Sequence, residues 1–337
     1  MSEQEKEQEF QTGGCYSRRD FLKVAGAAGV AVGLGAGVSS LLAGEASAWP
    51  GGATTTTAQQ ATTTTTTVGP PPDITLTEYN QLGLDLESHL YMRTYPMGIK
   101  LLKSEAEIPE GALRPKKDRN QHLAMCQVFS LARRQGTTTA MFIEDHWCFE
   151  PIIGFGLVET PQSFLDGYTN MFFMADKQAA AEHAQKYPRL PAGEYPGLVM
   201  GPLKTANFDP DLTVIYCNSA QLRHLLLALR YLKGSQVTST MDAIGSCVRA
   251  VVPSFLQGEC ALSVPDPGDF ERGGADEDEM ILTVPARRMG ELMEGIYRFE
   301  ESGPKFRNFN LGVYPDFPQP PFYVEYFKEW GLDGPKQ

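Results

Sequence analysis

Four cysteines, Cys126, Cys148, Cys247 and Cys260, are the side chains of this sequence best suited to bind a soft metal. Each lies on a predicted helix or at a predicted strand end, beside Gly, Pro or polar residues that let backbone approach a ligand. Thiolate sulfur is a ligand that iron, zinc and copper(I) accept, and four thiolates can hold an iron–sulfur cluster. The separations of 22, 99 and 13 residues match no compact metal motif. The pattern predicts a cofactor, an iron–sulfur cluster or another thiolate-bound metal, with a redox or electron-transfer role.

Two other roles for these cysteines stay open. They could form one or two disulfides, or they could be plain buried core residues. A fifth cysteine, Cys217, follows the β-branched run 213–215 and is predicted to be core. The sixth cysteine, Cys15, lies in the N-terminal signal peptide predicted below, and the odd number that remains after its removal argues against a complete disulfide framework. The matching functional alternative is a non-catalytic small-molecule binding or accessory protein with structural or disulfide-paired cysteines.

Glu144, Asp145 and His146 are the best candidates for acid/base catalysis. They follow a predicted strand at 137–143, and strand ends are where α/β folds present catalytic side chains. Histidine can exchange a proton near neutral pH, so a hydrolase or lyase using these three groups is a further hypothesis. A polar turn with a half-buried histidine is the alternative.

Acidic side chains also crowd residues 266–279, but without the regular spacing of a calcium-binding loop. We therefore expect a solvated loop there.

Hydrophobic periodicity predicts the elements that would position these groups. Alternating or continuous apolar runs indicate strands at 97–103, 137–143, 197–203, 212–217, 237–241, 260–264 and 280–284. Helical spacing indicates helices at 78–90, 121–134, 220–233, 244–256 and 287–300, with one long helix or two at 161–187. The fold class is α/β or α+β, a mixed sheet with flanking helices. A cysteine-bearing helix between two strands occurs twice along the sequence. This repeat suggests that the domain consists of two related halves.

Several short motifs occur across this region: Gly98-Ile99-Lys100-Leu101-Leu102, Glu107-Ile108-Pro109-Glu110-Gly111-Ala112, Cys126-Gln127, Glu144-Asp145-His146, Gly258-Glu259-Cys260 and Gly268-Asp269-Phe270-Glu271-Arg272. In combination they resemble a bacterial and archaeal family, domain-of-unknown-function family 169. The similarity spans roughly residues 75–300 and implies no established activity.

The N-terminus resembles a twin-arginine signal peptide. Ser17-Arg18-Arg19-Asp20-Phe21-Leu22-Lys23 precedes an apolar stretch from Val24 to Ala43, and Ala46-Ser47-Ala48 offers a cleavage site. The resemblance implies export of an already folded protein by the twin-arginine translocase to a periplasmic or extracellular location. We expect three parts: a signal peptide at 1–48, a Thr/Pro-rich disordered linker at 49–72 and a single globular domain at 73–337. Retention of the apolar stretch as a membrane anchor is the alternative.

Composition limits the partners. The predicted signal peptide carries six acids and four bases, so the remainder carries 35 acids and 25 bases, a net charge of −10. This acidic chain lacks the basic stripe that phosphate binding needs, so we expect no nucleic acid. No second apolar run reaches membrane length, so no stable span is expected after cleavage. The expected partners are the translocase during export and a redox partner for the cofactor.

Overall fold

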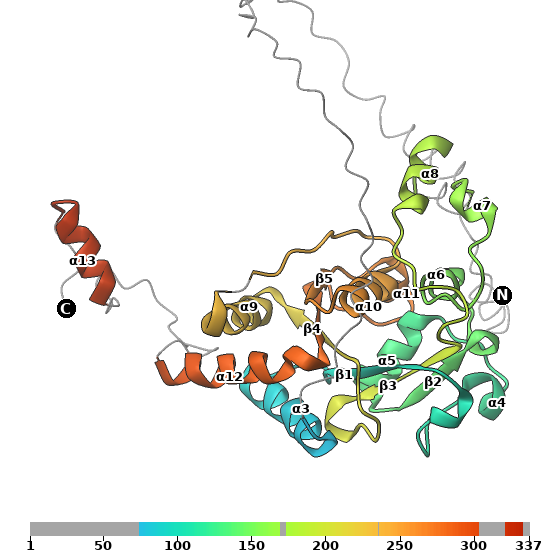
Figure 1. The fold of residues 1–337 in the computed structure, drawn as a ribbon, viewed down its shortest axis with the longest axis horizontal. Helices are drawn as coiled ribbons and strands as arrows, with labels where there is room; N and C mark the ends of the chain where they lie inside the picture. Colours follow the sequence, from blue (N-terminus) through green and yellow to red (C-terminus); the bar gives the residue numbers. More distant parts are fainter. Residues whose placement is uncertain (1–73, 169–172, 235, 303–320, 333–337) are drawn as a thin grey trace, which may run out of the picture. The chain divides into compact units, whose positions relative to one another are not determined.

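The computed structural model describes residues 74–168, 173–234, 236–302 and 321–332. The predicted signal peptide and linker lie outside the described residues. The predicted mixed fold is confirmed: a six-stranded sheet in the order β2-β3-β1-β4-β6-β5 has helices packed on both faces (Figure 1). Every pairing in this sheet is antiparallel. The strands are β1 (Met97–Leu102), β2 (Thr139–Phe142), β3 (Gly197–Pro202), β4 (Leu212–Asn218), β5 (Ala261–Ser263) and β6 (Glu279–Pro285).

The two halves of the sheet repeat one strand order. Strand β1 lies in the middle, where Met97 is opposite Pro202 of β3 on one side and Val214 of β4 on the other. Outward from the middle, one half reads β1, β3, β2 and the other reads β4, β6, β5. In each half, the strand that comes first in the sequence lies in the middle of the sheet. The third strand lies beside it, and the second lies at the edge. This repeat supports the option of two related halves.

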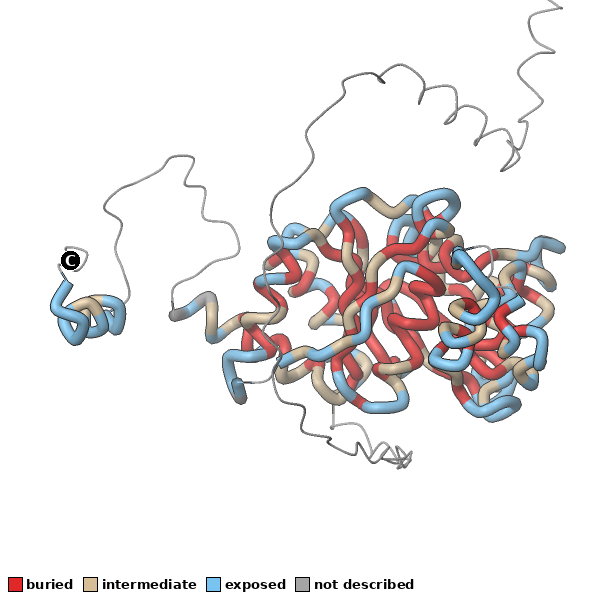
Figure 2. The backbone as a smooth tube through the Cα atoms, turned by 90° about the horizontal axis from the view of Figure 1, so that it is seen from above, coloured by how far each residue is buried: buried red, intermediate tan, exposed pale blue. Residues whose placement is uncertain are grey.

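Helices cover both faces of the sheet, which explains why the strands are apolar along their whole length. One face carries α5 (Met125–Gln135), α6 (Phe149–Gly154) and α10 (Ser246–Gln257). The other carries α3 (Leu76–Leu90), α9 (Ser219–Lys233) and α12 (Ala286–Ser302). On β4, Val214 and Tyr216 pack toward the first face, while Ile215 and Cys217 pack toward the second. Figure 2 shows the resulting buried interior, with exposed residues mainly in loops and outer helix faces.

Shorter elements connect this framework. They are α4 (Pro115–Arg119), α7 (Gln162–Leu165), α8 (Lys177–Gln185), α11 (Pro267–Glu271) and α13 (Pro321–Glu329), with 3-10 turns η1 (Glu105–Glu107), η2 (Ile143–Asp145) and η4 (Leu203–Thr205). Helix ends follow local chemistry. Gly136 ends α5 at φ +73°, which suits glycine, and Asn218 begins α9 with a capping box to Gln221.

One predicted element differs from the structure. Residues 237–241 form no strand, and Ser239 instead contacts β5 through its side chain, exchanging hydrogen bonds of 2.8 and 3.0 Å with the backbone of Leu262. At 161–187 the option of two helices is confirmed by α7 and α8, and the side chain of Asp176 starts the second of them.

A cysteine-lined cavity as candidate functional site

Three of the four predicted cofactor ligands, Cys126, Cys148 and Cys247, line one cavity of about 310 Å³. Cys126 lies in the first turn of α5, Cys148 immediately precedes α6, and Cys247 lies in the first turn of α10. These segments are distant in sequence and meet because their helices pack on the same face of the sheet. The cavity wall also includes Phe149, Glu150, Phe173, Asp266, Glu271 and Arg272.

A close helix contact brings two of these thiols together. Gly154, the last residue of α6, lies against Val248 of α10, and a Cβ built on Gly154 would be 2.4 Å from Val248 Cγ1. The Cβ of Val248 would itself be only 3.0 Å away, so rotation of that side chain cannot relieve the clash. Glycine therefore lets α6 approach α10, which places Cys148 and Cys247 on one cavity wall.

The fourth predicted ligand is elsewhere. Cys260 precedes β5 and packs in the core beneath α9 and α12, where it lines a second cavity with Arg288. Cys217 belongs to the same core, as predicted, and its Sγ donates to the carbonyl of Met280 at 3.7 Å. All five cysteines in the described ranges are free thiols, so none of them forms the disulfide considered as an alternative.

The thiols of the cavity are neutral at neutral pH. Burial raises the pKa of Cys126 and of Cys148 to about 12, and it raises the pKa of Cys247 well above its ordinary value. Carboxylates add to the effect: Asp269 and Asp266 beside Cys126, and Glu150 beside Cys148. A bound cation would reverse this balance, because positive charge favours thiolate over thiol. The cavity thus combines soft sulfur donors with acidic surroundings.

Glu150 is a titratable group of this cavity that sequence reasoning missed. The Cys148 thiol donates to its Oε2 at 3.7 Å. Burial, and then the charge of Asp266, raises the pKa of Glu150 to about 7. A carboxyl group that is half protonated near neutral pH can give or take a proton. The sequence does contain a pattern that could have identified Glu150. It is an acid between Phe149 and Pro151, in an apolar run two residues after the candidate ligand Cys148.

Asp266, which lines the cavity, and Asp269, which adjoins it in α11, form a second acidic group at this site. Asp266 caps α11, and its carboxylate accepts from the backbone N–H of Ser246 and of Asp269, each at 3.0 Å. The Asp269 carboxylate accepts from the Ser246 hydroxyl and, at 3.1 Å, from the Tyr216 hydroxyl. Burial, and then Asp266, raises the pKa of Asp269 to about 6. The expectation of a solvated loop at 266–279 is therefore wrong for Asp266 and Asp269, because both carboxylates are buried in polar networks.

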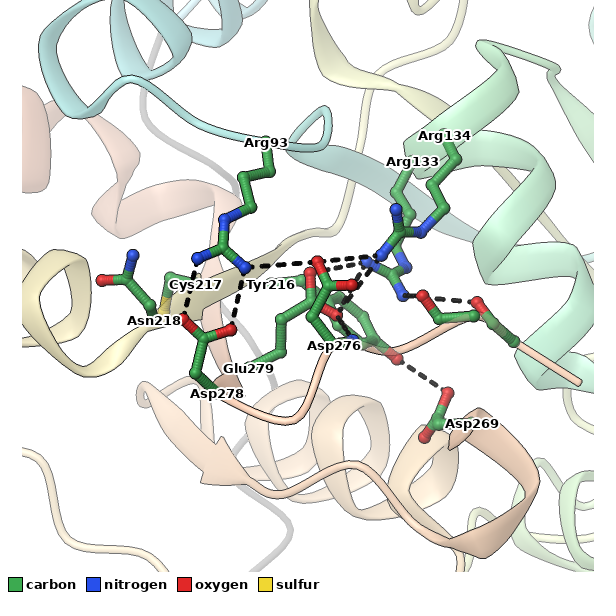
Figure 3. Close-up of polar contacts among 12 residues, drawn as sticks. Arg93, Arg133, Arg134, Tyr216, Cys217, Asn218, Asp269, Asp276, Asp278 and Glu279 are labelled. Atoms are coloured by element: carbon green, nitrogen blue, oxygen red, sulfur yellow. Dashed lines mark hydrogen bonds and ion pairs between the residues drawn. The ribbon is translucent and has the colours of Figure 1, made fainter. Parts of the chain in front are cut away.

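A buried ion pair fixes α5, the helix that carries Cys126, to the sheet. Figure 3 shows Arg133 facing Glu279 at the start of β6, with an Nη1–Oε1 distance of 2.8 Å. The Arg133 guanidinium also lies over the ring of Tyr216, 4.1 Å from its centre. Arg133 is 1% exposed, so this contact lies wholly in the interior. Toward the surface, Asp276 pairs with Arg134 and Arg93, which continues the network to solvent.

The structure places Glu144, Asp145 and His146 outside this cavity. The Asp145 carboxylate accepts from Arg114 Nε, Phe142 N and Lys116 N at 2.8–2.9 Å, and so anchors α4 to η2. Glu144 pairs with Arg114 at 2.5 Å.

Burial lowers the pKa of His146 to about 4, against the opposing effect of Asp145, so its imidazole is neutral at neutral pH. Neither of its ring nitrogens has a hydrogen-bond partner in the described part of the chain. The acid/base role of these three residues stays a prediction.

Comparisons with known proteins identify two regions. The model of the DUF169 family, described as uncharacterised ArCR, matches residues 85–295, which is more than half of the chain. A twin-arginine translocation signal matches residues 15–35. No curated protein and no solved structure matches the chain. Among the helices that the structure describes, none is both long and apolar enough to cross a membrane.

Proposed function

The chain belongs to the DUF169 family, and we propose that this exported member binds an iron–sulfur cluster or another thiolate-bound metal for redox chemistry or electron transfer. The observation that carries the proposal is the convergence of Cys126, Cys148 and Cys247 on one cavity. A common ligand would require such an arrangement, in which cysteines from three segments distant in sequence line one cavity. Twin-arginine export adds support, because this route suits proteins that fold and load a cofactor before they cross the membrane.

Within the described ranges, no three His, Cys, Asp or Glu side chains are arranged to hold one metal ion. The proposal therefore rests on the shared cavity, whose volume of about 310 Å³ leaves room for a cluster of several atoms. In the proposal, the three cysteines supply thiolates. The Asp266 or Glu150 carboxylate, or a substrate, takes the remaining position.

A second candidate is non-catalytic binding of a small organic molecule in the same cavity. It is favoured by the neutral thiols of the metal-free protein and by the aromatic walls, Phe149 and Phe173. Apolar cavities with a few polar groups are the usual form of small-molecule sites. In this case the cysteine side chains would line the cavity and contact the organic ligand, but they would not coordinate a metal.

Anaerobic purification of the mature protein separates the two candidates. The cofactor proposal predicts visible absorption from sulfur-to-metal charge transfer, with metal present and, for a cluster, acid-labile sulfide in matching amount. Growth in iron-supplemented medium guards against incomplete loading. A colourless protein that contains no metal after such growth would contradict the proposal and favour the organic ligand.

The predicted acid/base groups remain a separate proposal, in which Glu144, Asp145 and His146 act on a substrate. His146→Gln tests it, because the buried imidazole is neutral and can only accept a proton or donate its single N–H. Unchanged metal content with lost activity would support the acid/base role. Loss of metal would instead make His146 a ligand.

A further inference from the structure

A second and larger cavity, of about 750 Å³, shares no lining residue with the cysteine cavity. We call it the polar cavity. Its walls are residues 236–240, the outer side of α10, the start of β5 and the first turn of α12, with Lys186 at the end of α8. Three cationic side chains line it, from Lys186, Arg249 and Arg288.

The charge of the polar cavity is opposite to that of the chain. The sequence has 41 acidic and 29 basic residues, yet the cavity wall has three cations and one carboxylate, that of Glu259. Arg288 pairs with Glu259 at 2.7 Å and with Glu291 at 3.3 Å, so carboxylates balance its charge. Lys186 is exposed and makes no ion pair with any residue that the structure describes. A concave wall with an excess of one charge sign concentrates ions of the other sign.

Arg249 is the best-positioned of the three cations. It is 7% exposed, and its Nε donates to the carbonyl of Ile244 at 2.9 Å. Its Nη2 pairs with Asp242 at 2.6 Å, which holds the guanidinium plane in place. Its Nη1 has no such partner in the described part of the chain. An arginine fixed on one side offers its remaining N–H donors to a carboxylate or phosphate in a defined direction.

Neutral polar groups complete the wall. Thr238, Thr240 and Gln257 line the cavity, and none of their side chains makes a hydrogen bond within the described ranges. Ser239 differs, because its hydroxyl is committed to the backbone of Leu262. Free hydroxyl and amide groups between the cations suit a ligand with hydroxyl groups between its charges.

We infer that the polar cavity binds a hydroxylated small molecule carrying two or more anionic groups, either carboxylates or phosphates. Arg249 and Lys186 would contact the anionic groups, and the threonines would contact the hydroxyls. This site is separate from the cysteine cavity and does not depend on the proposed cofactor.

Isothermal titration calorimetry tests the inference, with citrate, fructose 1,6-bisphosphate and uncharged glucose as probes. We expect saturable binding of citrate or of fructose 1,6-bisphosphate, weakened by added salt, and no binding of glucose. Citrate binding alone would identify carboxylates, and fructose 1,6-bisphosphate binding alone would identify phosphates. Absence of saturable binding by both polyanions, or equal binding of glucose, would overturn the inference.

Single substitutions test whether the ligand binds in the polar cavity. Lys186→Gln changes an exposed residue and should weaken binding roughly tenfold or more, the value of a hydrogen bond to a charged group. Arg249→Gln should do the same, with Arg249→Lys retaining more affinity. Arg223→Gln, an exposed cation on α9, is the matched control and should have no effect. Equal affinity in wild type and Lys186→Gln would contradict the assignment. Cys247→Ser should leave this binding intact, which separates it from the cofactor proposal.

Discussion

Glu150 gives the cysteine cavity a group that exchanges its proton near neutral pH. Its pKa in the folded protein is about 7, above the ordinary 4.5, because burial disfavours the charged carboxylate. The folded state therefore holds this proton more tightly than the unfolded state. The resulting stability is fully present below pH 4.5 and is lost as pH rises through 7.

We predict that the free energy of unfolding of the metal-free protein falls as pH rises from 4.5 to 7. The contribution of Glu150 is at most about 3 kcal/mol, since one pKa unit corresponds to about 1.4 kcal/mol. Urea titrations across this range measure it. Glu150→Gln should flatten the slope, while Glu277→Gln, an exposed acid, should not. Asp269 has a raised pKa as well, whereas the lowered pKa of His146 acts in the opposite direction, so the test is the difference in slope between wild type and Glu150→Gln. An unchanged slope in that variant would contradict the assignment.

Residue types identified the three cysteines of the cavity, and the order of the helices and strands explains why the fourth predicted ligand, Cys260, lies apart from them. Cys126 and Cys247 lie on equivalent helices of the two halves, each just before an edge strand, β2 or β5. Cys148 follows β2, and the residue in the matching place after β5 is Asp266. Cys260 precedes β5 and so lies at the opposite strand end. Sequence spacing does not show strand direction, so Cys260 and Asp266 could not be told apart.

At the scale of elements, the cavity depends on the close packing of α6 against α10. We predict that Gly154→Ala lowers the free energy of unfolding by about 1–3 kcal/mol, because the new methyl meets the fixed Cβ of Val248. It should also lower cofactor occupancy, since α6 carries Cys148 at its start. Thermal unfolding and metal analysis measure the two effects.

Gly290→Ala is the matched control for this change. Gly290 lies inside α12, and its nearest neighbour there is the flexible end of Ile74, at 3.3 Å. Alanine is the better helix former, so this substitution should be neutral or slightly stabilising. A Gly154→Ala protein as stable as Gly290→Ala would show that the α6–α10 contact can relax.

Most helices and strands could be predicted because residues close together in the sequence determine them. The apolar periods of β1, β3, β4, α9 and α12 extend over whole elements, and Gly136 and Asn218 mark helix ends. The segment 237–241 has strand composition but no strand, because its contact with β5 runs through the side chain of Ser239. The Arg133–Glu279 pair joins residues 146 positions apart, and no local pattern reveals it.

At the scale of the whole molecule, the twin-arginine signal determines where the protein acts. We predict that residues 1–60 direct a fused reporter out of the cytoplasm and that Arg18→Lys with Arg19→Lys prevents it. N-terminal sequencing of the exported protein should begin at Trp49, after the Ala46-Ser47-Ala48 site. A reporter that stays in the cytoplasm with the unaltered signal would contradict the prediction. A start at Met1 in exported protein would instead favour a retained anchor.

Metal content per chain across the five single Cys→Ser variants tests the central claim most directly. The variants should be purified anaerobically and compared with wild type. Removal of a ligand leaves an incomplete site, so Cys126→Ser, Cys148→Ser and Cys247→Ser should each lose most of the bound metal. Cys217→Ser and Cys260→Ser, which change buried cysteines outside the cavity, should keep it. Equal metal content in all five variants, or loss confined to Cys260→Ser, would contradict the cysteine cavity as the cofactor site.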